Sequence, residues 1–141
     1  MRTRIKICGL TREADVEAAV AAGADALGFN CYAKSPRHVA PARLRPLPRG
    51  LPPFVTPVLL FVNAPSDLIE DALAAVPNAL LQFHGDEHEA ACSRYGHPYV
   101  RALRMEEGVD LLDSERQFPS AAAMLLDAPS AGYGGSGSTF D

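Results

Sequence analysis

The sequence predicts an α/β fold built on a parallel sheet. Six short apolar segments recur along the 141 residues, with segments of helical period between them. Repeated strand-then-helix units require parallel strands joined by right-handed crossovers. Six units give about 23 residues per unit, which is compact even for a barrel of strands and helices. An open, doubly wound sheet shares this alternation, but no GxGxxG fingerprint follows the first strand, which argues against a dinucleotide-binding form.

The first two strands are expected at 5–8 and 25–29. Between them, Thr11 is placed to cap a helix whose first turn carries acidic residues, where carboxylates suit the helix dipole. Gly23 is placed to end that helix. The proline-rich stretch 39–53 predicts a short or irregular helix, because proline removes a backbone donor.

The third strand is expected at 58–62, a continuous apolar run of the kind found in strands buried on both faces. Ser66 is then placed to cap a helix that Pro77 stops. The later elements are expected in the same alternation: strand 79–83, helix 86–95, strand 99–103, helix 107–118 and strand 122–127.

Composition favours one domain over residues 1–141, with 48% hydrophobic residues available for a core. A net charge of −4 gives no basic surface for nucleic acid. No long apolar run predicts a membrane span or a signal peptide. The three cysteines Cys8, Cys31 and Cys92 lack disulfide-scaffold or zinc-ligand spacing. A cytoplasmic protein without a metal is therefore expected.

Polar side chains recur where the predicted strands end. Cys8 ends the first strand, His84 follows the fourth, Arg101 and Arg104 lie at the end of the fifth, and Asp127 ends the sixth. In parallel α/β proteins, ligands gather at the carboxyl ends of the strands. We therefore expect a thiol, an imidazole, a guanidinium and a carboxylate to face one cavity.

A glycine- and serine-rich segment, 134–138, follows the sixth strand. Such a loop offers backbone N–H groups to a phosphate without side chains in the way. Glycine-serine stretches are more often flexible linkers. The position directly after a strand that ends in Asp127 favours the phosphate-binding interpretation.

These motifs resemble those of the phosphoribosylanthranilate isomerases. Lys6-Ile7-Cys8-Gly9-Leu10-Thr11 is similar to the opening motif of that family. Later signatures follow in the family's order: Ser35-Pro36-Arg37, Leu81-Gln82-Phe83-His84-Gly85, Leu126-Asp127, Gly134-Gly135-Ser136-Gly137 and Phe140-Asp141. The ordered set spans the whole chain and is far more specific than any one motif.

The resemblance implies a (β/α)8 barrel of the TIM barrel family, of which this chain would hold about the first six β/α units. It implies an Amadori rearrangement in tryptophan biosynthesis. N-(5′-phosphoribosyl)anthranilate would become 1-(o-carboxyphenylamino)-1-deoxyribulose 5-phosphate, a small-molecule isomerisation that needs no cofactor and no metal. Such a step needs one acid and one base.

The family's roles carry over to matched positions only. The resemblance assigns the general base to Cys8 and the general acid to Asp127. Arg37 would bind the anthranilate carboxylate through its guanidinium fork. The substrate-binding positions that the resemblance implies are Lys6, Arg37, Gln82, His84, Gly135, Ser136 and Gly137.

Other interpretations of the same residues remain open. Cys8 could be an inert buried thiol. Arg37 could lie on a solvated loop, and His84 could simply cap a turn between a strand and a helix. A related phosphosugar barrel, such as an indole-glycerol-phosphate synthase-like protein, would have a lysine-centred site, and Cys8 argues against it. A non-catalytic partial-barrel fragment or assembly module is a further alternative.

Even compact barrels of eight units run to roughly 200 residues. We therefore expect a domain incomplete at its carboxyl end, without strands seven and eight. The first and sixth strands would then expose unpaired edges, which invite association with another chain or with a missing C-terminal part. Alone, this polypeptide is expected to be poorly active.

Overall fold

The computed structural model describes residues 2–106 and 108–128. Within them lies a six-stranded sheet in the order β1-β2-β3-β4-β5-β6, and every neighbouring pair is parallel. The strands are β1 (Lys6–Cys8), β2 (Ala26–Asn30), β3 (Thr56–Phe61), β4 (Leu80–Phe83), β5 (Tyr99–Arg104) and β6 (Ala123–Asp127). The predicted α/β fold with a parallel sheet is confirmed.

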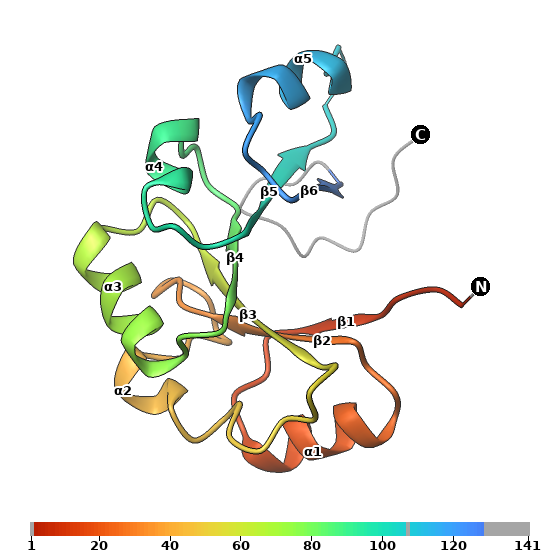
Figure 1. Cartoon of the computed structure of the whole chain (residues 1–141), viewed down its shortest axis with the longest axis vertical. Helices are drawn as coiled ribbons and strands as arrows, with labels where there is room; N and C mark the ends of the chain where they lie inside the picture. Colours follow the sequence, from red (N-terminus) through yellow and green to blue (C-terminus); the bar gives the residue numbers. More distant parts are fainter. Residues whose placement is uncertain (1, 107, 129–141) are drawn as a thin grey trace.

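Five helices connect consecutive strands. They are α1 (Glu13–Ala21), α2 (Pro41–Leu44), α3 (Ser66–Ala75), α4 (Glu89–Ser93) and α5 (Leu111–Gln117). Figure 1 shows them in an arc along the outer side of the row of strands. The sheet therefore has one face that packs on helices and an opposite, inner face.

One end of the helix α1 agrees with the prediction from the sequence and the other end does not. The prediction that Thr11 caps it is wrong: Arg12 is the N-cap residue, its side chain makes no capping bond, and it pairs instead with Asp15 at 2.7 Å. The prediction for Gly23 is confirmed. Its φ of +87°, which glycine adopts without steric cost, ends the helix, and its N–H donates to Val20 O at 2.9 Å.

The helices α4 and α5 are shorter than predicted. His88 begins α4 by accepting a hydrogen bond from the Ala91 N–H at 3.1 Å, and Asp110 caps α5 in the same manner. Asp86 and Glu87 were expected inside a helix, but their carboxylates bond to Asn63 on another segment. These contacts keep the chain in a turn until His88.

The core lies between the sheet and the helices. It is formed by alternate strand residues, because successive side chains of a strand point to opposite faces. The most buried of these, each no more than 1% exposed, are Leu27, Phe29, Leu59, Phe61, Leu81, Phe83 and Tyr99. The residues between them, including Gly28 and Gln82, consequently face the inner side.

The two outer strands leave apolar surface uncovered. In the described residues β1 and β6 each pair with one neighbour only. Beside β6 lies an open apolar hollow of about 410 Å³, and exposed Leu112 and Leu126 contribute to its lining. Ile7 on β1 is also exposed. Within the described part of the chain, no helix has the length and apolarity needed to cross a membrane.

Candidate active site at the carboxyl ends of the strands

Lys6 and Cys8 share the inner face of β1. They are two residues apart, so both side chains point the same way, and Cys8 lies in register with Gly28 of β2. A Cβ atom on Gly28 would come within 2.9 Å of the Cys8 sulfur and 3.0 Å of the Lys6 Nζ. The absence of a side chain at Gly28 thus leaves one space that the thiol and the ammonium share.

Arg37 lies against the end of β1, far from it in sequence. Its Nη1 donates to Cys8 O at 3.2 Å, and its side chain crosses Gly9 so closely that a Cβ there would be 2.6 Å from it. The Ser35 hydroxyl accepts from the Arg37 N–H at 3.2 Å and from Asn30 Nδ2 at 3.1 Å. The loop after β2 therefore brings a guanidinium to the backbone of Cys8, at the end of β1.

Gln82, His84 and Asp127 form a hydrogen-bonded chain across β4 and β6. Gln82 Nε2 lies 3.1 Å from His84 Nδ1, and His84 Nε2 lies 3.0 Å from Asp127 Oδ2. An amide nitrogen can only donate, so Nδ1 must accept. The proton of a neutral His84 is therefore on Nε2, which donates it to the carboxylate of Asp127.

A hollow of about 220 Å³ opens beside this chain, at the ends of β4, β5 and β6. His84, Asp127, Arg104 and Arg101 are among its lining residues. Arg101 lines the hollow but directs its guanidinium at backbone oxygens of the turn after β4, at 2.7 Å from Gly85 O. Groups of both charge signs therefore line the hollow.

The three cysteines differ in accessibility. Cys31 and Cys92 are 1% and 0% exposed, and burial raises the pKa of each thiol to about 12. They are packing residues of the core. Cys8 is only half-buried and lies at a strand end. Of the three thiols it has the environment in which chemistry with a small molecule can occur.

Three predicted positions fall outside the described residues: Gly135, Ser136 and Gly137. The remaining predicted positions divide into two groups at the same edge of the sheet. Lys6, Cys8 and Arg37 lie together at β1, and Gln82, His84 and Asp127 lie together at β4 and β6. In residues 2–106 and 108–128, no group of three His, Cys, Asp or Glu side chains is arranged to hold a metal ion.

The sequence did not single out Gly28 or Glu87. Gly28 could have been found, because a glycine opposite a strand-end thiol in a neighbouring parallel strand allows close approach. Glu87 could not, since two of its three partners, Asn63 and Arg101, come from separate segments that only the fold brings together.

Comparison with known proteins gives one consistent family. The family model described as N-(5′-phosphoribosyl)anthranilate (PRA) isomerase matches residues 5–141. The N-(5′-phosphoribosyl)anthranilate isomerase of Methylibium petroleiphilum is 62% identical over 141 residues, which are 100% of this chain and 66% of that protein. The chain thus spans about two thirds of the length of this curated relative.

Solved structures give the same result. The phosphoribosyl anthranilate isomerase of Thermotoga maritima superposes with a TM-score of 0.85 and 37% identity, over 99% of this chain and 68% of that one. A second phosphoribosyl anthranilate isomerase structure superposes with a TM-score of 0.79 and 33% identity, over 92% and 66%. That protein is in complex with reduced 1-(o-carboxyphenylamino)-1-deoxyribulose 5-phosphate. The six parallel strands therefore correspond to part of the barrel of these isomerases.

Proposed function

The chain belongs to the N-(5′-phosphoribosyl)anthranilate isomerase family, and we propose that it serves the aldose-to-ketose rearrangement of N-(5′-phosphoribosyl)anthranilate in tryptophan biosynthesis. The observation that supports this most is the pair of groups at the strand ends. A half-buried thiol ends β1, and a carboxylate bonded to an imidazole ends β6. The rearrangement needs one base and one acid, and the thiol and the carboxylate on the inner side of the sheet have the chemistry for these two roles.

Asp127 is the proposed acid. Its proton passes to the furanose ring oxygen, the bond between that oxygen and C1′ breaks, and the nitrogen lone pair forms a C=N bond to C1′. Because Oδ2 accepts from His84, the transferable proton is assigned to Oδ1. His84 and Gln82 thus fix the orientation of the carboxylate rather than donate the proton themselves.

Cys8 is the proposed base. As a thiolate it removes the proton from C2′, which yields an enolamine and neutralises the nitrogen. The enolamine becomes the ketone when its hydroxyl loses a proton and C1′ gains one, so no atoms or electrons are gained or lost overall. The ammonium of Lys6, in the space over Gly28, places a positive charge beside the reacting sulfur.

Other matched residues bind the ends of the substrate. The Arg37 guanidinium, fixed beside Cys8, suits the anthranilate carboxylate, because its planar fork matches two carboxylate oxygens. The backbone of Gly135, Ser136 and Gly137 is assigned to the phosphate. The product analogue bound in the related structure carries both kinds of group.

We further propose that the protein is cytoplasmic and acts on a small phosphorylated substrate. In this proposal neither a nucleic acid nor a membrane is a partner. Three unpaired cysteines support a reducing compartment. The uncovered sides of β1 and β6 support association through these edges, either with further chain or with another molecule.

The direct test is incubation of the full-length protein with N-(5′-phosphoribosyl)anthranilate. We expect conversion to a product of equal mass, identified by NMR as 1-(o-carboxyphenylamino)-1-deoxyribulose 5-phosphate. Heat-inactivated protein is the control. Unchanged substrate in the presence of folded full-length protein would contradict the proposed function and favour a non-catalytic module.

A further inference from the structure

Glu87 is a buried carboxylate behind the candidate site. Its side chain is 8% exposed, and it accepts three hydrogen bonds: from the Asn63 N–H at 2.6 Å, the Gly85 N–H at 2.9 Å and Arg101 Nη1 at 3.0 Å. A carboxylate with three donors, one of them a guanidinium, is firmly held in its position. It links the end of β3, the turn after β4 and the strand β5.

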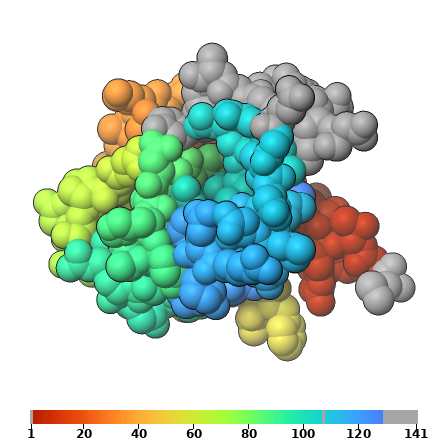
Figure 2. Space-filling model, turned by 90° about the horizontal axis from the view of Figure 1, so that it is seen from above, coloured from red at the N-terminus to blue at the C-terminus, as the bar shows by residue number. Residues whose placement is uncertain are grey.

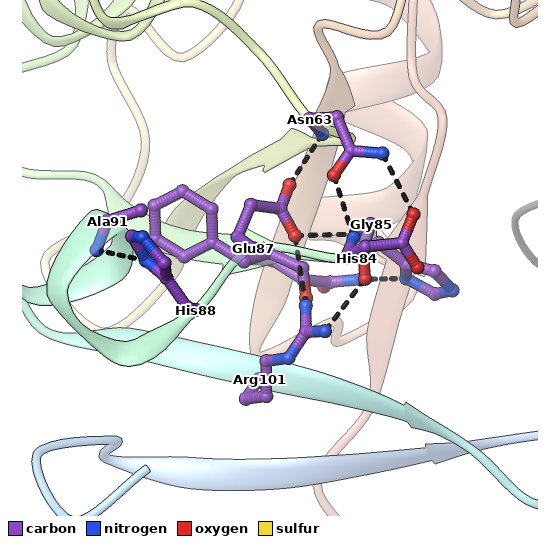
Figure 3. A network of polar contacts seen from close by, with 10 residues as sticks. Asn63, His84, Gly85, Glu87, His88, Ala91 and Arg101 are labelled. Carbon is purple, nitrogen blue, oxygen red and sulfur yellow. Dashed lines mark hydrogen bonds and ion pairs between the residues drawn. The ribbon is translucent and has the colours of Figure 1, made fainter. Parts of the chain in front are cut away.

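Arg101 also holds the turn after β4, through the carbonyl groups of its backbone. Its Nη1 donates to Phe83 O at 3.2 Å and its Nη2 to Gly85 O at 2.7 Å, as Figure 3 shows in part. The guanidinium carbon lies 5.0 Å from the centre of the Phe118 ring. Arg101 is 8% exposed and lies on the same side of β5 as Tyr99, which packs in the core.

Together these contacts fix every peptide group around His84. The His84 N–H donates to Phe61 O at 2.9 Å, and the carbonyl before it accepts from Arg101. The N–H of Gly85 donates to Glu87, and the Gly85 carbonyl accepts from Arg101. The backbone that carries the imidazole is therefore held on both sides, although neither charged residue touches the imidazole.

The turn also excludes a side chain at residue 85. A Cβ on Gly85 would lie 2.5 Å from Asn63 Oδ1 and 2.7 Å from Asn63 N. Asn63 itself has a φ of 47°, a left-handed conformation that asparagine tolerates better than most residues. Glycine at 85 thus lets the end of β3 close against the turn, within reach of Glu87.

We propose that Arg101 and Glu87 are positioning residues for the acid of the reaction, acting through His84. The inference rests on the proposed function of Asp127. The ion pair fixes the turn, the turn fixes the imidazole, and the imidazole presents its Nε2–H to Asp127 Oδ2 at 3.0 Å. The residues that contact a catalytic group must be held rigidly, because small displacements of that group lower the rate strongly.

The test uses Arg101→Lys and Glu87→Gln in the full-length protein, with Arg116→Lys on the exposed surface of α5 as the matched control. Lysine keeps the charge but lacks the fork that reaches the carbonyls on both sides of His84. Glutamine keeps the size of Glu87 but cannot accept from all three donors. Two quantities are measured: kcat and KM for the isomerisation, and the tautomer of His84 from long-range ¹H–¹⁵N correlations.

Both variants are expected to lower kcat by roughly 10- to 100-fold with KM changed less than about twofold, since positioning acts on the reacting step. The wild-type His84 spectrum should show the Nε2–H tautomer, and both variants should show a mixture of tautomers. Arg116→Lys should match the wild type in both measurements. Two different substitutions are used, so that if one variant fails to fold, the other variant still tests the proposal.

A wild-type His84 spectrum or a wild-type kcat in a folded variant would overturn the proposal. A loss of stability without a change at His84 would mean that the ion pair has only a structural role, which also overturns it. If the wild-type protein has no isomerase activity, the proposed function fails instead. The His84 tautomer would still report on the ion pair by itself.

Discussion

Gly28 shows at the scale of one residue how the site depends on the absence of a side chain. A methyl group there would meet the Cys8 sulfur at 2.9 Å and the Lys6 Nζ at 3.0 Å. Both atoms are ends of side chains and can move aside, while the Cys8 Cα, at 3.2 Å from the added methyl group, has to shift only slightly. The thiol would then leave the position in which it reaches the substrate.

Gly28→Ala is therefore expected to lower kcat by roughly 10-fold, because the base is displaced. The free energy of unfolding should fall by only about 1 kcal/mol, at the low end for an overpacked site. Steady-state kinetics and urea unfolding of the full-length variant measure the two effects. A variant with wild-type kcat would show that the shared space over Gly28 does not position Cys8.

The difference among the cysteines gives a second prediction. With pKa values of about 12, Cys31 and Cys92 hold on the order of one thiolate in ten thousand at pH 8. Both are also buried. Iodoacetamide should consequently modify Cys8 first in the native protein, and all three cysteines in urea.

Peptide mass spectrometry over a time course separates the three sites. Reduced 1-(o-carboxyphenylamino)-1-deoxyribulose 5-phosphate should slow the modification of Cys8, because the proposed site surrounds that thiol. Labelling of Cys31 or Cys92 in the native state as fast as Cys8 would contradict this assignment.

At this scale, the sequence predicted the residues at strand ends and missed their supports. Cys8, His84 and Asp127 each follow an apolar run, and parallel strands bring such positions to one edge. Glu87 follows no such pattern, and Arg101, although it lies near a strand end, was predicted to face the cavity and not to support the turn. Their importance comes from hydrogen bonds to backbone groups of other segments, which depend on the tertiary fold.

At the scale of elements, Asp25 ties the entrance of β2 to the segment before β1. Its carboxylate accepts from Arg2 at 2.6 and 2.8 Å, from Arg4 at 2.8 Å and from the Ile5 N–H at 2.8 Å. These bonds, that from Arg2 foremost, hold the pKa of Asp25 well below its ordinary value of 3.8. The charged form is thus favoured by folding.

The sign of the pH dependence follows. A carboxylate whose pKa is lowered by folding contributes stability above its unfolded pKa and loses it as the pH falls through the folded pKa. Asp25→Asn should lower the melting temperature at pH 7, and the difference from wild type should shrink from about pH 4 downward. The matched control is Asp71→Asn, on the exposed side of α3. A melting difference for Asp25→Asn that stays constant down to pH 2 would contradict this account.

The element boundaries show where periodicity stops being informative. All six strands and the helix α3 lie close to their predicted positions, because apolar residues mark them directly. The start of α4 was predicted too early, since 86–95 has helical composition and only the contacts of Asp86 and Glu87 with Asn63 keep its first residues in a turn. Composition does not encode such contacts.

At the scale of the molecule, β1 and β6 present open edges and uncovered apolar side chains within residues 2–106 and 108–128. Exposed edges and apolar patches favour association. We expect the 141-residue polypeptide on its own to associate at concentrations of about 100 μM. Leu126→Lys and Leu112→Lys should reduce that association, as measured by sedimentation velocity.

Phe54→Lys is the control for this prediction. Phe54 is 90% exposed but belongs to the loop before β3, and Figure 2 shows the corresponding yellow segment projecting from the body of the molecule. It should leave the association unchanged. A strictly monomeric 141-residue polypeptide would contradict the role given to the β6 side.

The central claim is that Cys8 and Asp127 are the base and the acid of the isomerisation. Its most direct test is the turnover of N-(5′-phosphoribosyl)anthranilate by full-length Cys8→Ala and Asp127→Asn, compared with the wild type at neutral pH. General acid and base groups contribute roughly 100- to 10,000-fold each, so each variant should lose kcat in that range while staying folded. Turnover within about threefold of wild type by either folded variant would contradict the claim, because a true acid or base contributes far more than that.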